Sequence, residues 1–253
     1  MKWQRGWTQM DKFDFTFGGR NASELGVKAT QRPNMPAAVK KIEETNVAAM
    51  DGSYYLDQGT YEDIQVPYSC NFLVQDGTEW DERVREIKGW LFHPIGPSRL
   101  IKNDDAEYYL RVRKVETSEF TRIYRRLAQF TVTFTCTAYQ YLVRGGTRVP
   151  CPEAVNNQFE TAYPIFYITT KYPTGNTATI TVNGNAVTVQ ITTPTTIIDV
   201  ERRMVYTGDH KIINGNATGD LDGLVLVKGA NTIKFGGTKN PATLEYVPNW
   251  RRL

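Results

Sequence analysis

The chain has 253 residues, of which 40% are hydrophobic and 23% are charged, with a formal net charge of +3. This composition is typical of a folded protein with a substantial core. The weak, interleaved charge argues against nucleic-acid binding, which usually shows a basic stripe or patch. No apolar run approaches the roughly 20 residues that span a bilayer, and the N-terminus lacks the apolar segment of a secretory signal. We therefore expect neither nucleic-acid binding nor membrane association.

The N-terminal third alternates between clear and ambiguous signals. Residues 13–17 predict a strand that two glycines end. Residues 37–44 are compatible with a short helix or with part of a hairpin arm, and Asp51-Gly52 predicts a turn. Residues 64–74 alternate strictly and predict a half-buried strand. Pro67 within it predicts a sheet edge or a bulge, because proline cannot donate to a ladder.

A helix is predicted over residues 81–91, with Thr78 as its cap and Pro94 beyond its end. Val84, Ile87 and Leu91 share one face of this helix, and Trp90 lies beside them. Residues 130–139 then predict a long strand whose apolar side chains face inward and whose threonines face outward. One helix on antiparallel strands indicates an α+β or sandwich-like domain.

Residues 144–152 contain two glycines and two prolines and mark the predicted domain boundary. The expected domains are therefore residues 1–143 and 144–253. The second domain reads as all β, with a hairpin around Asn183-Gly184. Further short strands are predicted at intervals of about ten residues, which is the spacing of a β-sandwich or jelly roll. They cover residues 196–200, 203–206, 224–227 and 231–235.

No group of residues in the sequence supplies catalytic chemistry. His93 and His210 lie in predicted loops without a partner at ligand spacing. Asp220 and Asp222 resemble the start of a calcium loop, but its later ligands are missing, which favours a polar turn. Cys70, Cys136 and Cys151 fit no metal motif, and the first two are predicted to be buried reduced thiols. We expect no enzyme activity, no cofactor, and no catalytic or metal-binding residue.

The order of motifs along the chain resembles the distal tail proteins of phages with long non-contractile tails that infect Gram-positive bacteria, in particular those of lactococcal phages. In the first domain the resemblance is carried by Phe15-Thr-Phe-Gly, Asp51-Gly52, residues 64–72, Ile87-Lys-Gly-Trp-Leu, residues 99–104 and residues 130–139. In the second domain it is carried by residues 156–165, Ile198-Asp199, residues 229–233 and residues 246–252.

The resemblance implies a mainly β protein, with an N-terminal β-sandwich-like domain that carries one α-helix and a C-terminal galectin-like or jelly-roll β-sandwich. It implies a structural virion protein, a homohexameric ring that joins the tail tube to the baseplate or tail tip. Its implied partners are the major tail tube protein, a tail-associated fibre or spike protein, and baseplate or receptor-binding components. DNA would pass through the ring channel. The implied location is the virion, after assembly in the host cytoplasm.

Two sets of contact residues are predicted. The extended, mixed apolar and basic segment before the Asp51-Gly52 turn is expected to reach a neighbouring subunit through Arg32, Met35, Lys40, Lys41 and Met50. Aromatic side chains of the second domain are candidates for sugar or partner contact, namely Tyr163, Tyr246 and Trp250. The alternatives for the whole chain are a carbohydrate-binding β-sandwich module and another tail or connector ring protein.

Overall fold

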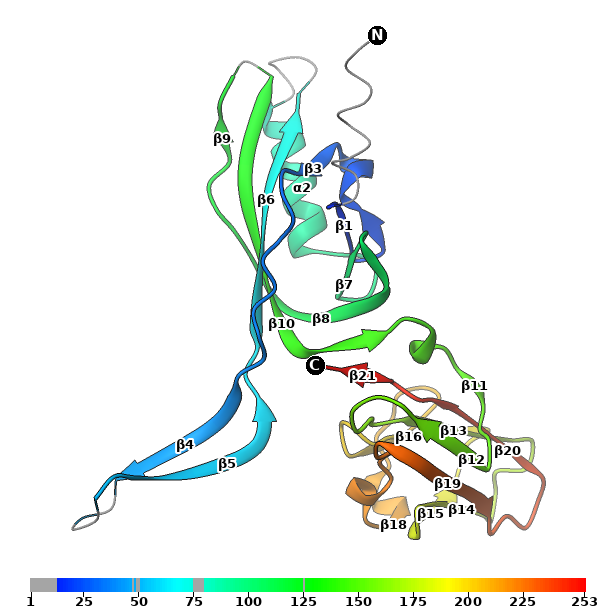
Figure 1. The fold of residues 1–253 in the computed structure, drawn as a ribbon. Coiled ribbons are helices and arrows are strands. Elements are labelled where there is room, and N and C mark those ends of the chain that lie inside the picture. The colour runs from blue at the N-terminus through cyan, green and yellow to red at the C-terminus, as the bar shows by residue number, and fades with distance from the viewer. Residues whose placement is uncertain (1–12, 47, 49–50, 75–79, 125) are drawn as a thin grey trace. The chain divides into compact units, whose positions relative to one another are not determined.

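A computed structural model shows the fold of the chain and describes residues 13–46, 48, 51–74, 80–124 and 126–253 (Figure 1). The chain divides into two compact units, which are residues 1–140 with Leu253 and residues 141–252. The division falls near the end of the long strand β10 (Leu127–Leu142), whereas the sequence placed the boundary between residues 143 and 144.

Unit 1 is built on one antiparallel sheet with the strand order β2-β1-β7-β8-β10-β6-β3, and β9 pairs with β10 as well. A separate two-stranded ladder joins β4 and β5. Besides β10, the strands of unit 1 and its α-helix are β1 (Phe15–Phe17), β2 (Arg20–Asn21), β3 (Val27–Ala29), β4 (Lys40–Asn46), β5 (Ser53–Tyr61), β6 (Ile64–Leu73), α2 (Trp80–Phe92), β7 (Arg99–Lys102), β8 (Asp105–Thr117) and β9 (Thr121–Arg122).

Aromatic contacts show that this sheet curls around its own core. Phe15 on β1 lies 4.3 Å, centroid to centroid, from Tyr68 on β6 and 5.3 Å from Phe134 on β10. β1 neighbours neither of those strands in the sheet order, so the sheet must bend to bring them together. The result is the sandwich-like arrangement expected from the sequence.

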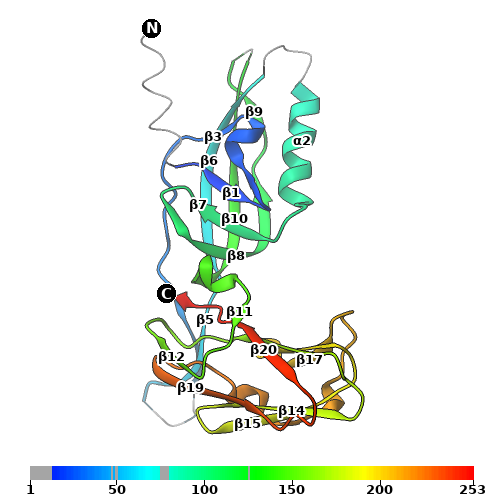
Figure 2. The same ribbon diagram turned by 90° about the vertical axis from the view of Figure 1, so that its right-hand side faces the viewer.

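The predicted helix is confirmed as α2, the one α-helix among the described residues. The helix lies beside the sheet of unit 1 (Figure 2). Its Ile87, Trp90 and Leu91 side chains are buried in the core, and Val84 is half-buried against it. The indole Nε1 of Trp90 donates to the Phe17 carbonyl at 2.9 Å, which ties the helix to β1. Thr78, the predicted cap, lies outside the described residues.

The structure decides two ambiguities of the N-terminal third. Residues 37–44 contribute to β4 of a hairpin and not to a helix. Pro67 lies at a local edge, as predicted: β10 pairs with β6 along its length, but β3 pairs only with residues 70–72. The missing amide of Pro67 therefore faces no neighbouring strand.

Unit 2 is a β-sandwich of two five-stranded sheets, with the orders β11-β20-β13-β16-β17 and β12-β19-β14-β15-β18 (Figure 2). Its core lies between them and is almost wholly aliphatic. The ten strands are β11 (Val149–Pro150), β12 (Ala154–Asn157), β13 (Ile165–Thr170), β14 (Asn176–Val182), β15 (Asn185–Ile191), β16 (Thr195–Asp199), β17 (Met204–Thr207), β18 (Ala217–Gly219), β19 (Gly229–Gly236) and β20 (Ala242–Val247). The short strand β21 (Arg251–Arg252) belongs to neither sheet and pairs with β10.

The predicted hairpin forms, with Asn183 and Gly184 at positive φ as a tight two-residue turn requires. The prediction of a strand over residues 224–227 is wrong. Leu224 and Leu226 are buried, but this stretch forms only an isolated bridge between Leu226 and Ala162. Its alternation reflects two side chains that enter the core from a loop, which periodicity cannot separate from a strand.

The hydrogen bond from Trp90 to Phe17 yields a stability prediction. Trp90→Phe keeps an aromatic ring beside Phe15, 5.7 Å away in the unchanged chain, and removes the indole donor. We expect a loss of about 1–3 kcal/mol in the free energy of unfolding of unit 1, because a carbonyl acceptor in the core loses a partner. Urea unfolding followed by tryptophan fluorescence and far-UV circular dichroism measures it; an unchanged midpoint and slope would contradict it.

Candidate assembly surface

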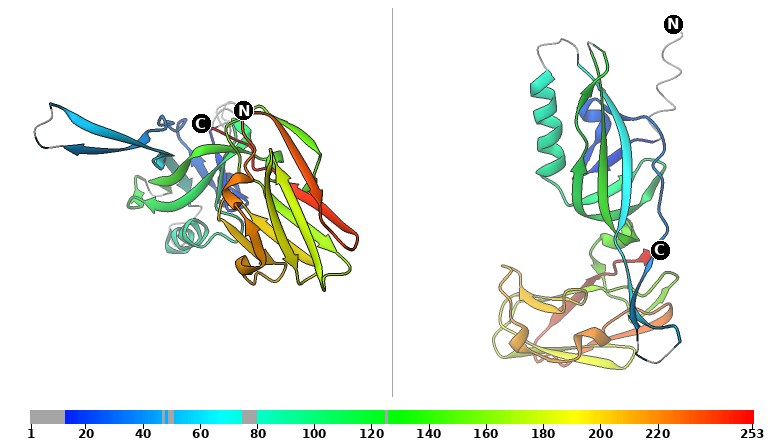
Figure 3. Two further views of the ribbon diagram at one scale, coloured as in Figure 1. Left: turned by 90° about the horizontal axis from the view of Figure 1, so that it is seen from below. Right: turned by 90° about the vertical axis from the view of Figure 1, so that its left-hand side faces the viewer.

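The hairpin of β4 and β5 extends away from the sheet of unit 1 as an arm without a core (Figures 1 and 3). Every residue of β4 is exposed, and in β5 only Ser53 and Tyr61 at its two ends are partly covered. The arm nevertheless carries large apolar side chains that are at least half exposed, namely Ile42 (54%), Tyr54 (56%), Tyr55 (62%) and Leu56 (50%). An exposed apolar surface of this kind marks a protein contact site.

The strand register places apolar side chains on both faces of the arm. Residues directly opposite in an antiparallel pair share a face. Ile42 lies opposite Asp57, and Tyr55 lies opposite Glu44, on one face. Leu56 lies opposite Glu43, and Tyr54 lies opposite Thr45, on the other. Both faces of the arm therefore combine apolar with acidic or polar groups.

At the arm's base Lys40 donates to Asp57 at 2.6 Å. This hydrogen bond raises the pKa of the Lys40 ammonium and lowers the pKa of the Asp57 carboxyl. Both groups stay charged at neutral pH, but about half of each side chain is exposed to solvent, so the pair contributes little to the stability of the hairpin.

The predicted interface residues fall on the arm or just before it. Lys40 and Lys41 are exposed on β4. Met35 is exposed and lines a shallow groove with Tyr61 and Ile64 at the arm's base. Arg32 instead turns back to its own unit, where its Nε donates to Asp104 Oδ2 at 2.7 Å. Met50 lies outside the described residues.

The sequence reasoning missed Tyr54, Tyr55 and Leu56, the arm's largest apolar side chains. Three consecutive apolar residues on an otherwise polar hairpin were the available signal, since a strand with one buried face would alternate.

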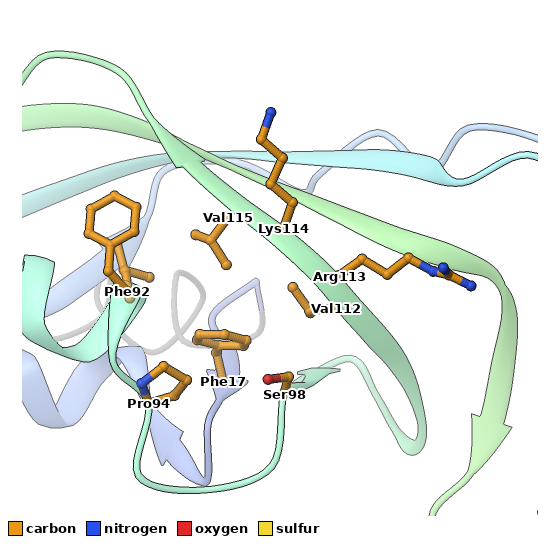
Figure 4. A pocket seen from close by; sticks show the side chains of 9 residues that line it. Phe17, Phe92, Pro94, Ser98, Val112, Arg113, Lys114 and Val115 are labelled. Carbon is orange, nitrogen blue, oxygen red and sulfur yellow. The ribbon is translucent and has the colours of Figure 1, made fainter. Parts of the chain in front are cut away.

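The sequence also gave no sign of a second apolar feature of unit 1, a small pocket beside the end of α2 (Figure 4). Phe17 forms its floor, and the apolar parts of β8 and of the loop after α2 form its walls. The charged ends of Arg113 and Lys114 point away from that floor. Its volume is about 180 Å³, and it is lined by Phe17, Leu91, Phe92, Pro94, Ser98, Val112, Arg113, Lys114 and Val115.

The candidate contact aromatics of unit 2 are largely engaged within the unit. Tyr246 is only 4% exposed and its ring stacks on Phe166 in the core, so it offers no face to a sugar. Tyr163 is half-buried, with the Arg251 guanidinium 4.5 Å from its ring centroid. Trp250 is half-buried and packs near Phe159 and over Gly145. The structure does not gather the three rings into one exposed platform.

The described part of the chain holds no group of three or more His, Cys, Asp or Glu side chains that could bind a metal ion. The Asp220–Asp222 segment is a capped turn, in which Asp220 accepts from the Asp222 amide and Asp222 accepts from Arg203. Cys70 and Cys136 are free and buried, as predicted, and Cys151 is free and partly buried. Burial raises the pKa of all three thiols, to about 12 for Cys136 and Cys151.

These thiol pKa values predict low reactivity. At pH 8 a thiol of pKa about 12 is ionised to only about one part in ten thousand, and the thiolate is the reactive form. We expect a native sample to consume far less than one equivalent of a disulfide reagent per chain, and a denatured sample to consume three. Spectroscopic thiol titration with and without guanidinium measures this; rapid reaction of a native thiol would contradict it.

Comparison with known protein families gives a match within unit 1. The family described as "Phage tail protein RIFT-related domain" matches residues 23–136. Unit 1 therefore contains a region similar to this phage tail domain. The match contains most of the curled sheet, the helix and the whole arm, and it includes every pocket-lining residue except Phe17.

A solved structure extends the likeness to unit 2. The crystal structure of SPP1 Dit (gp 19.1), described as a paradigm of the hub adsorption apparatus in Gram-positive-infecting phages, aligns with a TM-score of 0.60. Sequence identity is 12%, and the alignment covers 94% of this chain and 98% of the SPP1 protein. The chain thus resembles a distal tail protein in its fold, and the predicted mainly β fold is confirmed. No curated protein matches the chain in sequence.

Among the described residues, no helix is both long and apolar enough to cross a bilayer.

Proposed function

We propose that this chain is the distal tail hub, a structural protein without catalytic activity. Six copies close into a ring that joins the tail tube to the adsorption apparatus and leaves a channel for the DNA. One face of the ring meets the tail tube protein. The other meets a tail-associated fibre or spike protein, with baseplate or receptor-binding components beyond it.

The arm is the observation that supports this proposal. An isolated two-stranded hairpin is at best marginally stable in water, so the arm needs a surface to lie against. Burying each half-exposed arm side chain contributes on the order of 1 kcal/mol, and a ring repeats that gain at every junction. A cyclic ring requires two different patches per subunit, and an arm that reaches a neighbour supplies one of them.

In the proposed ring, Met35, Lys40, Lys41 and Met50 contact the adjacent subunit, and Arg32 holds the segment before the arm in place. A carbohydrate-binding role for unit 2 has less support, because Tyr246 is buried and Tyr163 is covered by Arg251. Trp250 and Tyr163 remain candidates for contact with another tail component. Assembly takes place in the host cytoplasm before the ring enters the virion.

Removal of the arm tests the ring. Replacing residues 43–56 with Asn-Gly joins Ile42 to Asp57 through a tight turn, and none of the described residues that it removes belongs to the core. We expect the shortened chain to fold and to remain monomeric, whereas the unchanged chain forms sixfold rings. Light scattering and negative-stain microscopy distinguish these outcomes; rings formed by the shortened chain would refute the arm's role, and an unchanged chain that stays monomeric contradicts the hub.

A point variant tests the same contact with a matched control. Ile42→Ser removes one apolar side chain of the arm, and Ile212→Ser removes an equally exposed isoleucine of unit 2, 58% against 54%. Only Ile42→Ser should raise the concentration at which rings half-assemble, by roughly fivefold or more, which corresponds to about 1 kcal/mol per junction. Mass photometry over a dilution series gives both values.

A further inference from the structure

The pocket beside α2 is rigidly framed. Gly18 has a φ of +60°, and a Cβ there would lie 2.5 Å from Pro94 Cβ. The Gly96 amide donates to the Gly18 carbonyl at 3.1 Å. Ile95 lies between these two anchoring points and is 100% exposed. The loop after α2 is therefore held against β1 while it presents an isoleucine to solvent.

The exposed apolar surface continues from Ile95 into the pocket. Phe92 is 45% exposed, and Val112 and Val115 are only partly buried against the core. The side chains of Val112 and Val115 face the ring of Phe17 (Figure 4). A volume of about 180 Å³ admits one large aliphatic or aromatic side chain and nothing bigger.

The rim of the pocket carries two basic side chains, and each forms an ion pair that is exposed to solvent. Arg113 lies 3.2 Å from Asp63, and Lys114 lies 2.8 Å from Glu116. Both basic side chains are more than 60% exposed, and ion pairs in solvent contribute little, so either cation can exchange its partner at small cost.

One face of the arm has the complementary pattern. Leu56 and Glu43 are direct cross-strand partners, so an aliphatic side chain and a carboxylate project side by side. No ion pair of Glu43 occurs within the described part of the chain. The face therefore offers one side chain of the right size together with a free negative charge.

We propose that the pocket beside α2 receives Leu56 from the arm of a second copy of this chain, while Glu43 of that arm pairs with Lys114 or Arg113. The inference rests on the proposed ring and identifies the second of its two patches. Arm and pocket are different surfaces of one subunit, so the contact is heterologous, and repetition of a heterologous contact closes a ring. The occupant is a second copy because the chain itself carries both the matching side chain and the complementary charge.

Photo-crosslinking from the arm tests this assignment. Rings are assembled from ¹⁵N-labelled unchanged chain and unlabelled chain with p-benzoylphenylalanine at Leu56, then irradiated and digested. Crosslinks should join the unlabelled arm to residues 92–98 or 112–115 of a labelled chain. Crosslinks within one copy, or to another region of the second copy, overturn the inference but leave the ring intact. If the unchanged chain forms no rings, the proposed hub fails as well.

Charge exchange provides an independent measurement. Glu43→Lys and Lys114→Glu should each raise the half-assembly concentration by about fivefold per contact, the upper range for an exposed ion pair. The double variant should recover most of that loss, because it restores the opposite charges. Two independent losses without recovery would argue against the pairing. The comparison does not depend on folding, since both positions are exposed.

Filling the pocket provides a third test. Ser98 is exposed at the pocket wall, so Ser98→Trp places a bulky ring there without removing a core side chain. Thr192→Trp adds the same ring to an exposed site in unit 2. Only Ser98→Trp should block ring closure; intact rings from it would overturn the pocket assignment.

Discussion

Phe15 packs against Tyr68 and Phe134, which belong to strands that are not its neighbours in the sheet, and the architecture of unit 1 depends on that contact. A sheet bent this far encloses its own core and needs no second sheet. With β1 held inside the curl, the Phe17 carbonyl reaches Trp90 and fixes the end of α2. The Gly18 turn then fits closely against Pro94, and the walls of the pocket follow from that fit.

The arm formed by β4 and β5, unlike the curled sheet, has no core of its own. No residue of β4 or β5 before Tyr61 belongs to a core, and the ion pair at its base is exposed. Backbone hydrogen bonds alone do not offset the conformational entropy of ordering such a hairpin. Its stability therefore depends on what it contacts. An element that cannot bury its apolar side chains within its own chain is better explained by assembly than by folding.

Unit 2 derives its rigidity from buried asparagines as well as from its aliphatic core. Asn231 exchanges hydrogen bonds with the backbone of Val227 and also accepts from Asn183. Asn176 accepts from three backbone amides and donates to the Asn240 carbonyl. These amides hold the loops between strands in single conformations, because each buried polar group would be costly without its partner. Such a unit suits a structural role in which loops present a fixed surface.

Most regular elements of this chain were determined by the sequence itself. Alternation over residues 64–74 and 130–139, the apolar face of α2 and the Asn183-Gly184 turn are local signals, and each produced the expected element. The order of motifs was also enough to indicate a resemblance to distal tail proteins. The local signals failed where a loop enters the core, at Leu224 and Leu226, since burial there comes from the fold and not from a ladder.

The assembly surfaces were decided by tertiary structure. The sequence placed contact residues before the Asp51-Gly52 turn but did not reveal Tyr54, Tyr55 and Leu56, because exposure depends on whether anything packs on a strand. The pocket joins Phe17, the end of α2 and β8, which the curl of the sheet brings together from three distant segments. Tyr246 was a predicted contact residue, but the fold places its side chain in the core of unit 2. Periodicity specifies which way a side chain points along its own element, and only the packing of elements decides what it meets there.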